Sequence, residues 1–235
     1  MMFSAMSAAL LICYLSTPWV KRTWRIANPE TNILPLPDAL IGLASPDGQR
    51  LLAESQARAD YGTLSTAFEA QIYLSYCGVA TGVMAKNALS HPKSVSQSSW
   101  FDDRPEGTRT RLETFYGGMT LADFTELVRS HHLEAQASHG GTVSEASFRE
   151  RLRTNMANAD DVMVINYHRK GVAQKGGGHF SPLAAYHAGT DRVLIMDVAA
   201  HKYPPVWAKV TDVWRALDTI DSDSQKSRGF VEIRR

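Results

Sequence analysis

The spacing of hydrophobic residues changes partway along the chain. From about residue 48 to residue 156, apolar side chains recur every three to four positions, a spacing that predicts helices covering a core with one face. After residue 160 they gather in short runs separated by Gly-rich turns, which is typical of strands. Helices followed by strands predict an α+β fold, in which a helical first half packs on a small antiparallel β-sheet in the second half.

Four helices are expected before residue 160. The first covers residues 48–58, the second begins at Cys77, and Thr120 is the expected N-cap of the third. Thr142 followed by Glu145 forms a capping-box pattern at the start of the fourth. The positions expected to face the core are Val79, Ala80, Val83, Met84, Ala88, Leu89, Leu121, Phe124, Leu127, Val128, Phe148, Leu152 and Met156.

The second part of the chain predicts neighbouring antiparallel strands. The segment from Gly189 to Asp191 predicts the turn of a hairpin, because two short apolar runs flank it. The expected elements are strands over residues 162–168, 179–187, 192–198 and 229–233 and a helix over residues 211–220.

Residues 1–20 form an apolar leader that carries no charged side chain. Lys21, Arg22 and Arg25 follow directly, on the downstream side of the apolar stretch. Secretory signals have basic residues before their apolar segment, so the leader is a degenerate signal peptide, a marginal membrane anchor or an upstream start of a cytosolic protein. Its apolar character favours export or membrane association over a cytoplasmic location. We expect residues 21–235 to form a single domain.

Composition and charge exclude several classes of protein. The chain has 235 residues, of which 44% are hydrophobic and 21% are charged, as in an ordinary globular protein with a sizeable core. The net charge of +1 gives no electrostatic reason to expect a nucleic-acid partner. The two cysteines do not form a zinc-type spacing or a thiolate cluster.

Cys77 is the first candidate for chemistry. The other cysteine, Cys13, lies in the leader, so residues 21–235 hold one thiol and cannot form an internal disulfide. A cysteine at a helix N-terminus meets free N–H groups and the positive end of the helix dipole, which favour thiolate over thiol. The alternative is a buried structural cysteine without reactivity.

A nucleophilic cysteine needs a base within hydrogen-bond reach, and the base needs an orienting partner. His179 begins one expected strand and Asp197 ends the next, so a hairpin would bring the two side chains together. The other histidines of the folded body lack an equally placed acidic partner. Three of them are expected in solvent on or beside a helix, namely His131, His132 and His139.

Several motifs surround these residues or follow them along the chain, namely Tyr76-Cys-Gly-Val-Ala80, Gly177-Gly-His-Phe-Ser-Pro-Leu-Ala-Ala-Tyr186, Leu194-Ile-Met-Asp-Val198, Lys202-Tyr-Pro-Pro-Val-Trp207, Asp221 and Gly229-Phe230. In this order they resemble the motifs of the phytochelatin synthases, papain-like enzymes that act on glutathione. The similarity covers roughly residues 35–233 and is closest to the short bacterial members, which lack a Cys-rich C-terminal extension.

The resemblance implies a papain-like cysteine protease fold and a role for each matching residue. Cys77 matches the nucleophile, His179 the general acid–base, and Asp197 the residue that orients it. Gln71 matches the glutamine whose side-chain amide forms an oxyanion hole together with the backbone N–H of Cys77. The positions that match those holding the γ-glutamylcysteinyl group are Asn166, Gly178 and Arg228.

The resemblance also implies a glutathione γ-glutamylcysteinyltransferase reaction. Cys77 would attack the Cys–Gly peptide carbonyl of glutathione, release glycine and keep a γ-glutamylcysteinyl thioester. Water would resolve the thioester to γ-glutamylcysteine, or a second glutathione would resolve it to a phytochelatin.

Glutathione is thus the implied partner, and no organic cofactor is implied. The resemblance also implies a heavy-metal ion such as cadmium, which would enter as a metal–glutathione thiolate, as substrate or activator. The lack of a thiolate cluster in the chain agrees with this implication. No residue is implied as a metal ligand, and a homodimer is left open.

Two other functions remain open. A glutamine six residues before a Cys-Gly pair also fits papain-like peptidases that cleave leader peptides, although the motifs from His179 to Gly229 favour the glutathione enzyme. The second alternative is a non-enzymatic protein that binds thiols or metals. The single cysteine of the folded body argues against metal binding, because one thiolate binds a soft metal poorly.

Overall fold

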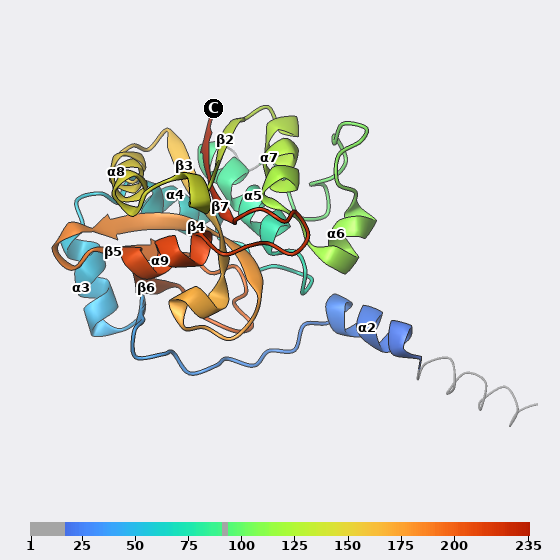
Figure 1. Cartoon of the computed structure of the whole chain (residues 1–235), viewed down its shortest axis with the longest axis horizontal. Helices are drawn as coiled ribbons and strands as arrows, with labels where there is room; N and C mark the ends of the chain where they lie inside the picture. Colours follow the sequence, from blue (N-terminus) through green and yellow to red (C-terminus); the bar gives the residue numbers. More distant parts are fainter. Residues whose placement is uncertain (1–16, 91–93) are drawn as a thin grey trace, which may run out of the picture.

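The computed structural model describes residues 17–90 and 94–235, and its helices lie on both sides of one β-sheet (Figure 1). The predicted α+β class is confirmed. The described helices are α2 (Pro18–Ala27), α3 (Pro46–Glu54), α4 (Ala59–Ala67), α5 (Cys77–Leu89), α6 (Arg111–Gly117), α7 (Leu121–Ser130), α8 (Glu145–Asn155) and α9 (Val210–Leu217), with 3₁₀ turns η1 (Gly140–Thr142), η2 (Arg169–Val172) and η3 (Ala188–Thr190). The described strands are β1 (Ile41–Gly42), β2 (Glu134–His139), β3 (Asp161–His168), β4 (Gly178–His187), β5 (Arg192–Ile195), β6 (Val206–Lys209) and β7 (Gly229–Arg234).

The sheet has the strand order β1-β6-β5-β4-β3-β7-β2, and every neighbouring pair is antiparallel. The inner strand β3, next to the central strand β4, is buried on both faces. Val162 and Val164 pack into the core on one side, whereas Met163 and Ile165 pack into the core on the other. A strand covered on both faces carries apolar residues at consecutive positions, which is why the sequence there does not alternate between apolar and polar residues.

Helices α4, α5 and α7 cover one face of the sheet, and α8 and α9 cover the other. Helix α5 runs through the centre of its layer, and eleven of its thirteen residues are buried. A Cβ atom at Gly82 would lie 2.4 Å from the Trp100 ring, and one at Gly78 would lie 2.5 Å from the sulfur of Met119. Both glycines therefore allow neighbouring side chains to approach the backbone of this helix closely.

Two predicted helix boundaries were wrong. The helix expected over residues 48–58 ends at Glu54, and a separate helix, α4, begins at Ala59. Thr120 caps α7 as predicted, but Ser144, not Thr142, caps α8. Thr142 lies instead in the 3₁₀ turn η1, where its hydroxyl donates to the backbone carbonyl of His139, the last residue of β2.

The sheet is larger than the sequence predicts. Strands β1, β2 and β6 were not expected, and the strand expected over residues 192–198 ends at Ile195. Because β1 comes before most of the helices, helices and strands are not divided between the two halves of the chain. His139 lies on β2 rather than beside a helix.

His131 is buried, so the prediction that it lies in solvent was wrong. Its ring stacks on the Trp100 ring with the centroids 4.0 Å apart, and its Nε2 lies 3.0 Å from the Trp100 carbonyl oxygen. Burial lowers the pKa of His131 despite that hydrogen bond. The contact fastens the loop before α6 to the end of α7.

Residues 1–16 of the predicted leader lie outside the described residues. The described chain begins just before α2, whose Trp19 and Trp24 are exposed. No helix within residues 17–90 and 94–235 is long and apolar enough to cross a membrane. After α2 the chain runs along the body in an extended conformation to α3 (Figure 1), held where the Leu34 N–H donates to the Lys202 carbonyl at 3.0 Å.

Candidate active site

Cys77 is the first residue of α5, at the point where this central helix meets the sheet. The N-cap residue, Tyr76, provides no side-chain cap, and the first N–H groups of a helix have no intrahelical acceptor. The partly buried Cys77 lines a cavity of about 320 Å³ between α5, the start of β4 and the loop before β7. The thiol thus lies where the sequence predicts it, at a helix N-terminus facing an open space.

His179 lies beside Cys77 on β4 and contacts the acid that the sequence pairs with it. Its Nε2 is 2.9 Å from Oδ1 of Asp197, and its ring also hydrogen-bonds the Cys77 thiol. Because Nε2 is taken by Asp197, the nitrogen that serves Cys77 is Nδ1. The Tyr167 ring packs edge-on against the imidazole with the centroids 5.7 Å apart, which further limits its rotation.

The three groups alter one another's pKa values. Burial raises the pKa of the Cys77 thiol, but the charge and hydrogen bond of His179 outweigh burial and bring it below its ordinary value, helped by the Phe180 N–H. Burial and the charge of Arg169 lower the pKa of His179, whereas Asp197 and Cys77 raise it, and the net pKa is raised. These directions favour a thiolate beside an imidazolium.

Arg169 is a part of the site that the sequence did not reveal. It is buried, and its guanidinium donates from Nη1 to Oδ2 of Asp197 at 2.7 Å and from Nη2 to Oδ1 at 2.9 Å. Burial would raise the pKa of Asp197, but the charges and hydrogen bonds of His179 and Arg169 hold it well below its usual range. In the sequence Arg169 precedes Lys170 at the end of a strand, and nothing there marks one of the two as buried.

Gln71 is buried close to the site but is not one of the residues that line the cavity. Its Nε2 donates to the carbonyls of Tyr73 at 2.9 Å and Leu74 at 2.8 Å, while its Oε1 is buried without a hydrogen-bond partner. The two carbonyls require a donor, so they fix the orientation of the amide. Both Nε2 protons are therefore engaged within the loop that leads to Cys77.

Asn166, Gly178 and Arg228 all line the cavity. Arg228 is buried, donates from Nη1 to the Ile220 carbonyl at 2.7 Å and leaves its Nε without a partner. Its Nη2 is 3.4 Å from Oδ1 of Asp221, an acid in the same cavity to which the sequence assigned no role. A positive and a negative group thus lie side by side in the wall of the cavity that Cys77 also lines.

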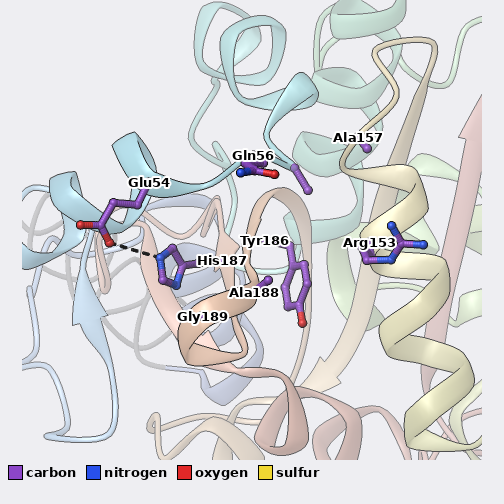
Figure 2. A pocket seen from close by; sticks show the side chains of 9 residues that line it. Glu54, Gln56, Arg153, Ala157, Tyr186, His187, Ala188 and Gly189 are labelled. Atoms are coloured by element: carbon purple, nitrogen blue, oxygen red, sulfur yellow. Dashed lines mark ion pairs between the residues drawn. The ribbon is translucent and has the colours of Figure 1, made fainter.

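A larger cavity, of about 510 Å³, lies at the opposite end of β4 (Figure 2). Glu54 and His187 point toward one another across it, with Oε2 and Nε2 3.3 Å apart, and Arg153 of α8 faces it from another side. Its lining contains no cysteine, serine or threonine that could act as a nucleophile. Chemistry, rather than size, therefore identifies the cavity at Cys77 as the candidate active site.

No cluster of three or more His, Cys, Asp or Glu side chains that could hold a metal ion is found within residues 17–90 and 94–235. The side chains brought together at the site are a thiol, an imidazole, a carboxylate and the arginine that contacts this carboxylate.

Comparison with known proteins gives the same family as the motifs. A family model described as phytochelatin synthase matches residues 31–230. The chain is 37% identical over 210 residues to glutathione gamma-glutamylcysteinyltransferase 3 of Lotus japonicus, which covers 86% of this chain and 43% of that protein. It is 31% identical over 209 residues to glutathione gamma-glutamylcysteinyltransferase 1 of Arabidopsis thaliana, covering 86% of this chain and 43% of that one.

A relative from Schizosaccharomyces pombe, named glutathione gamma-glutamylcysteinyltransferase, is 28% identical over 176 residues, 73% of this chain and 42% of that protein. The chain thus spans less than half the length of these curated relatives. Since the family model covers most of the sequence, the chain belongs to the phytochelatin synthase family.

Proposed function

We propose that this protein transfers the γ-glutamylcysteinyl group of glutathione through a thioester on Cys77. The observation that carries the proposal is the arrangement at the start of α5, where Cys77 contacts His179 and His179 contacts Asp197 at 2.9 Å. A nucleophile, a base and an orienting acid in this order are the parts that acyl transfer by a cysteine needs. The names of the curated relatives support glutathione as the substrate.

The first half-reaction cleaves the Cys–Gly peptide bond. The Cys77 thiolate attacks the carbonyl carbon, and the tetrahedral intermediate collapses as Nδ1 of His179 gives its proton to the departing amine of glycine. A γ-glutamylcysteinyl thioester remains. Asp197 keeps Nδ1 directed at the thiol and stabilises the imidazolium, and Arg169 keeps Asp197 ionised.

The second half-reaction depends on which nucleophile meets the thioester. Water yields γ-glutamylcysteine, and the α-amine of a second glutathione yields a longer peptide, a phytochelatin. In both cases neutral His179 accepts a proton from the nucleophile and the Cys77 thiolate leaves, so the resting pair is restored. We expect hydrolysis to predominate, as the resemblance to the short bacterial members implies.

We propose that the oxyanion is held by the backbone N–H of Cys77 and by Nε2 of Gln71. Donors of this kind are worth about 3–4 kcal/mol of the barrier each. The Gln71 amide is already oriented by the Tyr73 and Leu74 carbonyls, so one of its protons must be shared with or released to the oxyanion. The role of Gln71 therefore includes a small movement of this loop when substrate binds.

Arg228 and Asp221 suit the other end of the substrate. The γ-glutamyl group carries an α-carboxylate and an α-ammonium on the same carbon, and the cavity offers a guanidinium and a carboxylate 3.4 Å apart. We propose that these residues bind the two charges, with Asn166 and the backbone at Gly178 along the intervening wall. The Oδ1 atom of Asn166 is buried and unpartnered, which supports a role as hydrogen-bond acceptor.

Several wider proposals accompany this function. Residues 21–235 form a single catalytic domain with a papain-like architecture, supported by a nucleophile at the start of a central helix and a base on an antiparallel sheet. Cadmium or a similar ion enters as a glutathione thiolate or acts as an activator, and no organic cofactor takes part. Residues 1–20 direct export or membrane association, and a homodimer remains an alternative to a monomer.

The decisive experiment incubates the purified full chain with glutathione, with and without cadmium, and identifies the products by mass spectrometry. We expect glycine and γ-glutamylcysteine, with longer γ-glutamylcysteinyl peptides wherever transfer competes with water. Cys77→Ala should abolish all products, whereas Cys13→Ala, the matched change at the other cysteine, should leave them unchanged. Glutathione cleavage by Cys77→Ala would refute the enzymatic proposal, and cleavage of a leader peptide without cleavage of glutathione would favour the peptidase alternative.

A further inference from the structure

Helix α2 contacts the body of the protein beside the cavity that Cys77 lines. Its buried residue is Ile26, whereas Trp24, two residues earlier, is 69% exposed. The match to the family model begins at residue 31, so α2 is not part of that match. Contacts of α2 with two walls of the cavity nevertheless indicate a part in the reaction.

The first contact is with the loop that carries Gln71 and leads to Cys77. The Leu74 N–H donates to the Ile26 carbonyl at 2.9 Å, and the Leu74 carbonyl accepts from Nε2 of Gln71 at 2.8 Å. Two hydrogen bonds in series therefore connect α2 to the amide proposed as an oxyanion donor. The side chain of Leu74 is 42% exposed, so Leu74 is held by these main-chain bonds more than by burial.

The second contact is with the end of α6, which forms another wall of the cavity. Nη2 of Arg22 donates to the Tyr116 carbonyl at 2.9 Å, and the Thr23 hydroxyl lies 3.2 Å from the Tyr116 hydroxyl. The next residues along the chain, 117–119, line the cavity. Figure 1 shows α2 beside α6, at the side of the body where this wall lies.

Leu74 stands between two cavities. On one side it lines the cavity at Cys77, and on the other it lines a cavity of about 280 Å³ whose walls include Arg25 of α2. The loop therefore has open space on both sides. The Ser75 hydroxyl donates to the Phe115 carbonyl at 2.7 Å, so the two walls that α2 contacts are also joined to each other.

We propose that α2 positions the loop of residues 71–76, and with it the oxyanion donor Gln71, an inference that rests on the proposed function. One Nε2 proton of Gln71 has to turn from its carbonyl partners to the oxyanion, and the tie between Leu74 and Ile26 keeps the accompanying shift of the loop small. A misplacement of about 1 Å can cost about 100-fold in rate. Ile26 and Arg22 do not line the cavity, so they are positioning residues.

Ile26→Asp in the full chain tests the inference. A carboxylate is costly to bury, so this change detaches α2 from the loop. Trp24→Asp is the matched control, because it introduces the same side chain at an exposed position of the same helix. Ile26→Val keeps an apolar side chain at the contact and is the conservative variant.

Hydrogen exchange measured by mass spectrometry reports the contact itself, without reference to activity. In Ile26→Asp the Leu74 amide should exchange about 10-fold faster than in the parent protein, because it has lost its acceptor. In Trp24→Asp and Ile26→Val it should exchange as in the parent. An unchanged rate in Ile26→Asp, or an equal acceleration in Trp24→Asp, would overturn the inference.

Glycine release from glutathione separates positioning from binding. Ile26→Asp should lower kcat about 10- to 100-fold and change KM less than about 3-fold, because Arg228 and Asp221 lie by the loop before β7 rather than at α2. Both other variants should keep kcat within about 3-fold of the parent. An unchanged kcat in Ile26→Asp, or a change confined to KM, would overturn the inference while the parent stays active. A parent protein that releases no glycine would refute the proposed function and this inference together.

A second pair of variants covers the case in which Ile26→Asp fails to fold, as judged from its Tm. Arg22→Ala removes the hydrogen bond to the Tyr116 carbonyl, whereas Lys21→Ala removes the exposed basic side chain next to it. Arg22→Ala should lower kcat about 3-fold with KM unchanged, and Lys21→Ala should match the parent. Equal values of kcat in these two variants would then overturn the inference.

Discussion

Replacing Arg169 by methionine gives the sharpest test of how Asp197 and the proposed catalytic residues are held in place. Asp197 accepts four hydrogen bonds, of which two come from Arg169 and the others from His179 and the Ala199 N–H. The side chains of Arg169 and Asp197 are 4% and 0% exposed. Arg169→Met keeps much of the volume but leaves a buried carboxylate with two of its four donors and without its arginine counter-charge.

The cost can be worked out from that burial. Breaking a buried ion pair by removing one partner costs about 3–5 kcal/mol, and each kcal/mol lowers Tm by about 2–4 °C in a chain of this size. We therefore expect Arg169→Met to melt roughly 6–20 °C below the parent protein. Arg50→Met is the matched control, because Arg50 pairs with Asp47 at 2.9 Å but both side chains are more than 60% exposed. That variant should melt within about 2 °C of the parent.

The pH dependence of this stability follows from the lowered pKa of Asp197. A carboxyl whose pKa is depressed by folding stabilises the protein above its unfolded pKa of about 3.9, and this contribution is lost as pH falls through the folded value. The difference in Tm between Arg169→Met and the parent should therefore be full at neutral pH. It should shrink as the solution becomes strongly acidic.

The same variant should shift the pH profile of glycine release. Arg169 lowers the pKa of both Cys77 and His179, so its removal raises both. The acid limb of kcat/KM, where the thiolate forms, and the alkaline limb, where the imidazolium is lost, should both move to higher pH. Arg169→Lys keeps the positive charge but not both hydrogen bonds to Asp197. Its pH profile should therefore lie close to that of the parent protein, whereas its Tm should remain lower. A melting temperature like that of the Arg50→Met control, or limbs that do not move, would show that Arg169 does not support Asp197.

Three further changes test separate parts of the structure. Asp197→Asn removes the negative partner of the His179 imidazole and should lower kcat/KM for glutathione by about 10²–10⁴-fold, measured as glycine release. A loss smaller than about 10-fold would contradict the proposed orienting role. Gly178→Ala places a Cβ 2.8 Å from Nη2 of Arg228 and should raise KM roughly 10-fold with a smaller change in kcat. An unchanged KM would show that Arg228 does not bind the substrate. Gly82→Ala places a Cβ 2.4 Å from the Trp100 ring and should lower the free energy of unfolding by about 1–3 kcal/mol through overpacking. This corresponds to a Tm lowered by about 2–12 °C. A Tm equal to that of the parent would mean that the ring moves aside freely.

The residues that the sequence located best are those whose signals are local. Cys77 precedes a helical pattern, and His179 and Asp197 flank a turn that brings them together, so their proximity followed from spacing alone. The hairpin of β4 and β5 forms as predicted, although β5 is shorter than expected. The roles of these residues remain predictions until the variants are measured.

The features that the sequence did not locate depend on distant partners. Arg169 can be buried because Asp197 and Gln174 accept its hydrogen bonds. The residues next to Arg169 in the sequence give no sign of these distant partners. Strand β2 carries small and polar residues at the sheet edge, so its identity comes from pairing with β7 rather than from alternation. The burial of His131 depends in the same way on Trp100, which arrives from another part of the chain.

The position of Cys77 has a consequence for synthesis of the protein. The groups that lower the pKa of its thiol are His179, Phe180 and Arg169, and all of them lie about 100 residues later in the chain. A ribosome therefore completes α5 well before it makes the base, and the emerging cysteine carries only the helix end to activate it. The surroundings that lower the pKa of the thiol form when β3 and β4 dock against α5, so the proposed nucleophile gains its thiolate character only once the fold is complete.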